Sequence, residues 1–466
     1  MRGLRIEVRN DERSMDIIMK KEKDPKASSL STKLCYATGD IGCNFVWTFI
    51  SGFLMLYYTD SVGVSAAFVG TMFFICRALD GMSDLGMGVI IEKTSSRFGK
   101  ARPWVLLFSI PLSISLLLIF NVPATLPYLG KQVYIYTTYI LMAVICYTAV
   151  NLSYNAMLPR FSLTSHDRNL VSAIKGAAVI VAALLVSLLT PFLMEAFGGY
   201  QSQKAWSQTT AIYAVIALVM LLITFFGVKE KIAPNIDEDG KPAKVEVKKA
   251  LSLLIKNKYF YVATALFVVF YAITGTGGVG IYFARDILGD ANLFGLISAI
   301  AILPMIIGIP ILPAMYKKFG KRNVMLVGAL VSAAGCLLQL INPASLPLYL
   351  TFAIVRGFGS IMFSLPIFTL ASDIVELDER RYGFRAEGLV TSSNSLGIKV
   401  GTGLGAAMVG WILALGKYDA DAAVQLDSSL NAMIVLQIGM PLVLSLVLAV
   451  LLIFWDIEKK LQVYDN

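Results

Sequence analysis

The sequence predicts an all-α membrane protein whose twelve transmembrane helices form two six-helix bundles. Of its 466 residues, 57% are hydrophobic and only 15% are charged, and the mean hydropathy is +0.70. A soluble globular protein carries about 25% charged residues. A long polar stretch at 229–258 divides the apolar segments into two sets of six. These observations predict two membrane-embedded halves joined by a linker.

Each predicted crossing has the length that a bilayer requires, which is about 20 mainly apolar residues for a helix. The twelve stretches lie at 34–58, 65–91, 103–122, 132–157, 171–197, 208–228, 259–284, 291–316, 323–340, 349–375, 387–416 and 431–456. We therefore expect an N-terminal bundle at 34–228 and a C-terminal bundle at 259–457. The remaining segments are 1–33, the linker at 229–258 and a tail at 458–466.

The basic residues predict the orientation. If the N-terminus is inside, 32 of the 40 Lys and Arg residues fall in inside segments and 4 in outside loops. Short cytoplasmic loops are enriched in these residues. We expect a multi-pass protein of the inner cell membrane with both termini, and 1–33, 229–258 and 458–466, in the cytoplasm. The first 33 residues show no apolar core of a signal peptide. The net charge of +9 then reflects loops near anionic lipid, and no nucleic-acid partner is expected.

A short repeat relates the two halves. Residues 97–100 read Arg-Phe-Gly-Lys after the second span, and residues 318–321 read Lys-Phe-Gly-Lys after the eighth. Equivalent positions in the two halves indicate a duplication of a six-span unit, which is the plan of major facilitator transporters, with binding sites at the midplane between the halves.

Three charged residues, Arg77, Asp80 and Asp84, lie within the second span. A carboxylate at membrane depth costs at least ~2.5 kcal/mol, so such residues usually face a cavity and mark an ion or substrate path. Asp80 and Asp84 are four residues apart and share one helix face. Two acids on a wet cavity suit a small cation. The alternative is an internal salt bridge with Arg77 that only holds helices together.

Further polar residues cluster on a few spans: Asp40 and Asn44, then Ser83, then Tyr147, Thr148, Asn151 and Asn155, then Lys175, and in the second half Asp373 and Lys399. Lys399 lies roughly 18 Å into its span at 1.5 Å per residue. A lysine at that depth should face carboxylates, water or a ligand. For the amides, the alternative to substrate binding is hydrogen bonding between helices.

These strings resemble the glycoside-pentoside-hexuronide:cation symporter family, which includes the melibiose carrier. The segments that carry the resemblance are 36–40 with Asn44, 57–60, 77–84 with 87–88, 97–104, 372–376, 385–388 and Lys399. The resemblance implies uptake of a glycoside, oligosaccharide, pentoside or hexuronide, coupled to Na⁺ or H⁺, by alternating access in a major facilitator fold. No resident cofactor is implied, because the ion is co-transported.

The resemblance also implies a cation site. Asp80 and Asp84 align with the family's cation-binding carboxylates, and Thr148 with a cation ligand. Two carboxylates with the Ser83 and Thr148 hydroxyls offer the hard oxygen ligands that Na⁺ prefers, by the logic that holds for Ca²⁺ and Mg²⁺. A proton remains open, because a buried carboxylate with a raised pKa can carry one.

The expected substrate site departs from the melibiose carrier. Asn44 and Asn151 replace its sugar-binding acids, Asn155 its tryptophan and Lys175 its arginine; Tyr147, Ser395 and Lys399 complete the expected set. Amides still donate and accept hydrogen bonds. With Lys175 and Lys399 less offset by acids, an anionic sugar becomes credible, although a neutral glycoside is slightly favoured because the family's known substrates are mostly uncharged.

The basic loops are expected to brace the cytoplasmic side when that side is closed. This gate comprises Arg97, Lys100, Arg102, Asp373 and Arg385. The alternative role is topology alone. Among functions, the alternative to symport is a carrier of lipid or another amphiphile in the same fold. An enzyme is not expected, since no nucleophile–base pair or metal cluster is visible. The expected partners are a sugar, a monovalent cation and the bilayer, with the chain acting as a monomer.

Overall fold

The computed structural model of the chain describes residues 28–162, 164–230, 257–382, 387–422, 424–458 and 460–461. Most of the segments 1–33, 229–258 and 458–466 therefore lies outside the described residues, as does the predicted gate residue Arg385. Within the described ranges every regular element is a helix.

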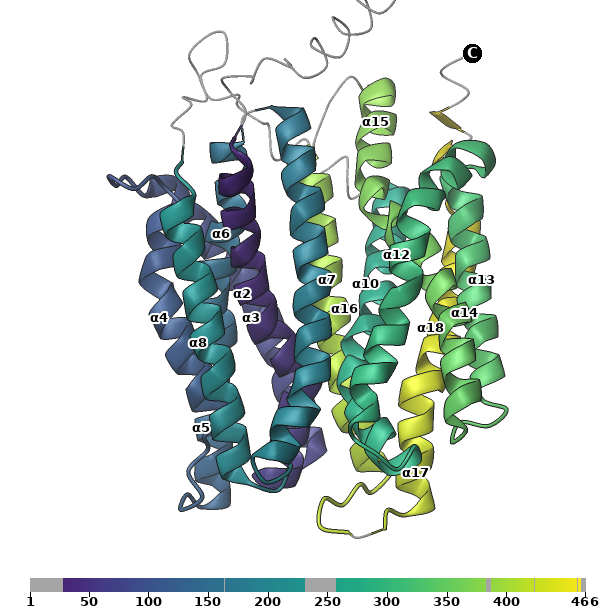
Figure 1. Ribbon diagram of the computed structural model, residues 1–466. Coiled ribbons are helices and arrows are strands. Elements are labelled where there is room, and N and C mark those ends of the chain that lie inside the picture. The colour runs from purple at the N-terminus through teal and green to yellow at the C-terminus, as the bar shows by residue number, and fades with distance from the viewer. Residues whose placement is uncertain are drawn as a thin grey trace, which may run out of the picture.

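The first half contains six helical crossings (Figure 1). They are α2 (Leu30–Leu56) with its continuation η1 (Tyr57–Ser61), α3 (Ala66–Lys93), α4 (Arg102–Ile119), the continuous run of α5 (Tyr128–Tyr139), η2 (Ile140–Tyr147) and α6 (Thr148–Phe161), α7 (Ser165–Ala196) and α8 (Gln203–Gly227).

The second half repeats this number. Its crossings are α10 (Lys258–Gly275) continued by η3 (Thr276–Val279), α11 (Gly280–Tyr282) and η4 (Phe283–Ile287), then α12 (Leu293–Phe319), α13 (Lys321–Gln339), α14 (Leu346–Ser364) with η5 (Pro366–Thr369) and α15 (Leu370–Tyr382), α16 (Glu387–Leu415), and α17 (Asp427–Ile434) with η6 (Val435–Gly439) and α18 (Met440–Ile453). In the described residues, eleven crossings are long and apolar enough to span a membrane, and α3, which contains five charged residues, is not among them. The predicted twelve-helix architecture is confirmed.

Local sequence sets where several helices begin. The Ser29 hydroxyl accepts a hydrogen bond from the Thr32 amide at the start of α2, and Ser65 accepts one from Phe68 at the start of α3. Thr164, Ser202 and Asn257 cap α7, α8 and α10 in the same way. Short polar side chains satisfy amides that have no partner in the first helical turn, which is why these residue types occur there.

The helices pack as two bundles that lie side by side in Figure 1, with α4 and α8 at one edge and α13 and α14 at the other. In the first bundle α2 packs against α7 and α8, and α4 against α6 and α8. In the second bundle α10 packs against α16 and α18, and α13 against α14 and α18. The bundles meet where α3 crosses α16 and α7 crosses α12.

The two ends of the molecule differ. We call the end with Leu30 and Asn257 the linker end, and the opposite end the Asp60 end. Towards the Asp60 end, α3 and α16 approach so closely that a Cβ atom on Gly70 would lie 2.7 Å from the Ala407 carbonyl oxygen. A Cβ atom on Gly410 would lie 2.2 Å from the Ala66 carbonyl oxygen. Small residues allow this backbone contact between helices, so the bundles are joined tightly at the Asp60 end.

The repeated loops have the same local structure, as the duplication predicts. Gly99 and Gly320 both have positive φ, of 108° and 80°. In each loop a glutamate that follows the last helix of the same bundle approaches the glycine: Glu230 near Gly99 and Glu458 near Gly320. The Glu230 carboxylate accepts hydrogen bonds from three consecutive amides that begin at Lys100. Positive φ and the nearby carboxylate together explain the glycine in both copies.

Candidate functional site

Two neighbouring cavities lie between the bundles. We call them the Asp84 cavity, of about 310 Å³, and the Phe294 cavity, of about 340 Å³. Both take their walls from α2 and α3 of the first bundle and from α10 and α16 of the second. They share Trp47, Arg77, Thr274 and Thr402. A site built from both bundles changes shape whenever the bundles move relative to each other.

An ammonium group lies between the two carboxylates of α3. Lys399 Nζ, on α16, is 2.6 Å from Asp84 Oδ2 and 3.3 Å from Asp80 Oδ2, and it donates to the Asp80 carbonyl oxygen at 2.8 Å. The sequence predicts that Lys399 faces carboxylates, water or a ligand, and the carboxylates are what it faces. In this arrangement the Lys399 ammonium occupies the space between the two carboxylates that are predicted for the cation site.

The four residues predicted for the cation site lie together. Thr148 Oγ1 donates to Asp80 Oδ1 at 2.8 Å, which links α6 to α3. Ser83 Oγ donates to the Asp80 carbonyl oxygen at 3.0 Å and lies 3.3 Å from Thr148 Oγ1. In the part of the chain that the structure describes, no group of three or more His, Cys, Asp or Glu side chains is placed to hold a metal ion. The oxygen atoms that these four residues bring together belong to two carboxylates and two hydroxyls.

Arg77 takes part in the same cluster. Its Nη1 lies 3.3 Å from Asp80 Oδ2, so the salt bridge considered as the alternative does form. The guanidinium also stacks over the Trp47 ring, 4.0 Å from the ring centroid. Asp80 therefore has three partners, on α3, α6 and α16, whereas Asp84 has its ion pair with Lys399 and a side chain that is 33% exposed. Of the two acids, Asp84 has the more exposed side chain.

The amides predicted for substrate binding form a chain along α6. Asn155 Nδ2 donates to Asn151 Oδ1 at 3.1 Å, and Lys175 Nζ on α7 donates to Asn155 Oδ1 at 2.5 Å. Asn151 and Tyr147 line the Asp84 cavity, so the chain leads from this cavity to Lys175. These side chains can donate and accept hydrogen bonds, as a polyol requires.

Asn44 and Ser395 are placed differently. Asn44 Nδ2 donates to the Asp40 carbonyl oxygen of its own helix at 2.9 Å. Ser395 is exposed, one turn before Lys399 on α16. Neither residue lines the Asp84 or the Phe294 cavity.

Sequence reasoning did not match Asp40 with Lys175. Asp40 is only 4% exposed, and its Oδ1 lies 3.9 Å from Lys175 Nζ. The sequence suggests that acids offset Lys175 and Lys399 less than in the melibiose carrier; in this structure Asp40 lies near Lys175, and Lys399 pairs with Asp80 and Asp84. The signal in the sequence was an acid at mid-span of α2, but the identity of its partner on α7 depends on how the helices pack.

A second cross-bundle cluster, also missed, lies at the Asp60 end. Arg285 Nη1 is 2.6 Å from Asp60 Oδ2, and Arg285 Nη2 donates to the Tyr418 hydroxyl at 2.7 Å. The Tyr418 hydroxyl donates to both Asp60 oxygens at 2.9 Å. Burial raises the pKa of Tyr418 above its usual 10.0, so the hydroxyl keeps its proton. We call Asp60, Arg285 and Tyr418 the latch.

The predicted gate residues contact their own bundles in this structure. Lys100 pairs with Glu92 at 3.1 Å, and Arg102 Nε donates to the Phe225 carbonyl oxygen at 2.8 Å. The Arg97 guanidinium stacks over Phe98. In the second bundle Lys321 Nζ pairs with Asp373 at 2.5 Å. Their predicted role belongs to a state in which the linker end is closed, so it stays a prediction.

A model of the family described as MFS/sugar transport protein matches residues 35–459. The chain belongs to this family. The match covers both bundles and every cavity residue described above, so the family assignment includes the whole candidate site.

Relatives in this family span almost the same length. The chain is 32% identical over 434 residues to the isoprimeverose transporter of Lactiplantibacillus pentosus, covering 92% of this chain and 89% of that protein. It is 27% identical over 396 residues to the glucuronide carrier protein homolog of Escherichia coli K12, covering 84% and 85%. The crystal structure of a D-xylose-proton symporter has the same fold, with a TM-score of 0.63 at 17% identity, covering 92% of this chain and 97% of that one.

Proposed function

We propose that this chain is a cation-coupled sugar symporter that works by alternating access. The observation that carries the proposal is the position of Lys399: a lysine of the second bundle lies between two carboxylates of the first, in the wall of a cavity that both bundles form. A cation that binds Asp80 and Asp84 must compete with this ammonium, so ion binding changes the bond between the bundles.

The relatives support the sugar as substrate. One is named for isoprimeverose and another for a glucuronide. The amides of α6 offer the hydrogen bonds that such polyols need. Three basic side chains, Arg77, Lys175 and Lys399, are matched by Asp40, Asp80 and Asp84. Because no cation is left unmatched among these six residues, they favour an uncharged glycoside over an anionic one.

The coupling ion is proposed to be Na⁺ or H⁺. Two carboxylates and two hydroxyls suit Na⁺, and either acid can carry a proton instead. The chain is proposed to act as a monomer in the inner membrane, with both termini and the linker in the cytoplasm, as the distribution of Lys and Arg predicts.

Together with the contacts between the bundles, this orientation indicates which side of the membrane the cavities face. The bonds at Asp60, the Thr71–Trp411 bond and the Glu195–Asn292 bond join the bundles at the Asp60 end or between that end and the midplane. With the linker end in the cytoplasm, the outer side is closed. The structure then represents an inward-facing state, from which the substrate leaves toward the cytoplasm.

The test is uptake of radiolabelled sugars into proteoliposomes that contain the purified chain, under an inward Na⁺ gradient, an inward proton gradient or neither. We expect at least one neutral glycoside to accumulate when one or both gradients are present, and not to accumulate when neither is present. Exchange without any gradient effect would contradict cation coupling. Absence of transport across a panel of neutral sugars and uronides would contradict the sugar as substrate.

A further inference from the structure

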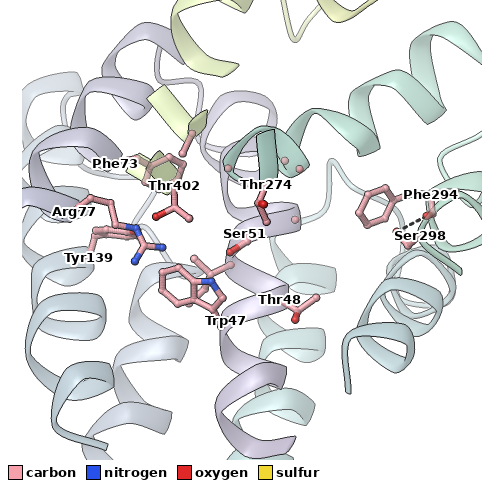
Figure 2. Close-up of a pocket in the computed structure, with 16 residues that line it drawn as sticks. Trp47, Thr48, Ser51, Phe73, Arg77, Tyr139, Thr274, Phe294, Ser298 and Thr402 are labelled. Atoms are coloured by element: carbon pink, nitrogen blue, oxygen red, sulfur yellow. Dashed lines mark hydrogen bonds between the residues drawn. The ribbon is translucent and has the colours of Figure 1, made fainter. Parts of the chain in front are cut away.

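The Phe294 cavity lies beyond the cluster of Asp84 and Lys399, toward the latch. In Figure 2, Trp47, Ser51 and Thr274 occupy its centre, with Arg77 and Tyr139 on one side and Phe294 and Ser298 on the other. At about 340 Å³ it is as large as the Asp84 cavity. Sites for small ligands measure ~300–1,000 Å³, so each cavity alone is at the small end of that range.

Part of the wall of this cavity is aromatic. Trp47, Phe73, Tyr139 and Phe294 line it from four different helices. Phe294 packs edge to face against Phe53, with 5.2 Å between the ring centroids, which fixes the orientation of its ring. Flat rings of this kind offer apolar faces with a negative quadrupole, against which the C–H face of a sugar ring can lie.

Three hydroxyl groups that line this cavity already donate hydrogen bonds to backbone carbonyl oxygens. Thr402 Oγ1 donates to the Ile398 carbonyl oxygen at 2.8 Å, and Ser298 Oγ donates to the Phe294 carbonyl oxygen at 2.8 Å. Thr274 Oγ1 donates to the Phe270 carbonyl oxygen at 3.2 Å. Each hydroxyl oxygen has two acceptor lone pairs. Beside these three hydroxyls a ligand therefore meets acceptors, which suits a ligand that carries O–H donors.

The cavity does not favour a charged ligand. Arg77 is the one charged residue among the sixteen that line it, and it is paired with Asp80 at 3.3 Å. By contrast, the Asp84 cavity contains Asp80, Asp84 and Lys399 as well. The two cavities thus differ in chemistry, and the ion site and amide chain are on the Asp84 side.

We propose that the Phe294 cavity is a subsite for a second, uncharged sugar ring, so that the substrate is a two-ring glycoside. One ring lies in the Asp84 cavity near Asn151, and the other crosses Trp47 into the Phe294 cavity. This inference rests on the proposed function of sugar transport. Trp47 belongs to both cavities, so it contacts the linkage between the rings.

Gly277 offers a direct test. It lines the Phe294 cavity and not the Asp84 cavity, and a Cβ atom there would meet no atom within 4 Å. Its φ is not positive, so a side chain causes no backbone strain. Gly277→Leu therefore fills the cavity with little other change. Gly277→Ala, which adds one methyl group, is the matched control.

The experiment measures competition by unlabelled sugars in counterflow, for isoprimeverose, melibiose and cellobiose and for the monosaccharides that compose them. For wild-type protein we expect at least one disaccharide to compete better than its monosaccharides. In Gly277→Leu the affinity for that disaccharide should fall by about tenfold or more, the loss of one ring's contacts, while the monosaccharides change less than about threefold. Gly277→Ala should resemble wild type.

The subsite would be overturned if Gly277→Leu lost affinity for the disaccharide and the monosaccharides equally, or if its disaccharide affinity were unchanged. It would also be overturned if wild-type protein preferred the monosaccharides. If Gly277→Leu does not fold, Ser298→Leu fills the same cavity from α12 and is judged by the same ratio. Failure of the proposed function is distinguishable, because wild-type protein would then transport none of these sugars.

Discussion

Asp60 and Arg285 lie 225 residues apart in the sequence, yet their side chains form a 2.6 Å ion pair that joins the two bundles at one end of the molecule. The Asp60 side chain is only 1% exposed. A carboxylate removed from water to this extent depends on its partners, so the pair has different energies in the closed and open arrangements of that end.

Loss of the latch should open the Asp60 end. Removing one partner of a buried ion pair costs roughly 3–5 kcal/mol. Here the pair exists only when the Asp60 end is closed, so the substitution destabilises the closed state relative to the open state. We expect Arg285→Gln to raise maleimide labelling of a cysteine placed at Ser51, in the Phe294 cavity, by about tenfold or more when the reagent is added from the Asp60 side. Tyr418→Phe, which removes only hydrogen bonds, should have a smaller effect. Labelling equal to that of the Ser51→Cys parent would contradict the role of the latch.

Asp84 should be required for coupling but not for exchange. Its side chain is one third exposed and its described ion pair is with Lys399, so Asp84→Asn should fold. The substitution removes one of two charged ligands and leaves Lys399 paired with Asp80. We expect gradient-driven accumulation to be lost while sugar counterflow continues, with Ser83→Ala as a milder control. Concentrative uptake at the wild-type level in Asp84→Asn would refute the cation site.

Asp40 and Lys175 should be energetically coupled. Lys175→Gln leaves the buried Asp40 carboxylate without its nearest positive charge, and Asp40→Asn removes that carboxylate. Interacting charges show coupling energies of ~0.5–3 kcal/mol. Thermal unfolding in detergent should therefore show the double variant to be more stable than the sum of the single losses predicts. Strict additivity would mean that the 3.9 Å approach has no energetic effect.

The same variants test the charge of the substrate. If the substrate is uncharged, Lys175→Gln should weaken the binding of a neutral glycoside and of its uronide to the same extent, because glutamine still donates a hydrogen bond to either sugar. A charge-assisted bond to a carboxylate would be worth ~1.5–3 kcal/mol. A selective loss of the uronide, by about tenfold or more, would contradict the neutral substrate.

Gly99 and Gly320, the positive-φ glycines of the two repeated loops, should be sensitive to substitution in the same way. A non-glycine residue in a left-handed conformation costs roughly 1–2 kcal/mol. A Cβ atom on Gly99 would also come within 2.5 Å of the Glu230 carboxylate, and one on Gly320 within 2.9 Å of Glu458. Gly99→Ala and Gly320→Ala should each lower the melting temperature in detergent. Gly86→Ala, at a helical position where a Cβ atom meets nothing within 4 Å, is the control and should not.

Arg102 should affect the rate of transport more than binding. In this structure its guanidinium contacts Phe225 of its own bundle. If it braces the linker end when that end is closed, Arg102→Gln should slow turnover several-fold and leave sugar affinity unchanged. Lys318→Gln, in the last turn of α12 within the second copy of the repeat, provides the comparison. Normal turnover in both variants would leave only a topological role for these charges.

The sequence by itself determined how many helical crossings the chain makes, about how long each one is and where it lies in the chain. Hydrophobicity is a local property, and a bilayer requires a fixed length of it, so the predicted span 65–91 closely matches α3 (Ala66–Lys93). The placement of Asp80 and Asp84 on one helix face also follows from local geometry. The repeated glycine loops followed from matching strings in the two halves.

The tertiary structure alone decided which charges meet. Lys399 reaches Asp80 across 319 residues of sequence, Lys175 lies near Asp40, and Arg285 pairs with Asp60. Each of these contacts depends on how two helices rotate and cross. For α3 and α16, which carry Asp80 and Lys399, the crossing is set by close packing at Gly70 and Gly410. Such packing sums many weak contacts from distant segments, and no periodicity within one segment reports it.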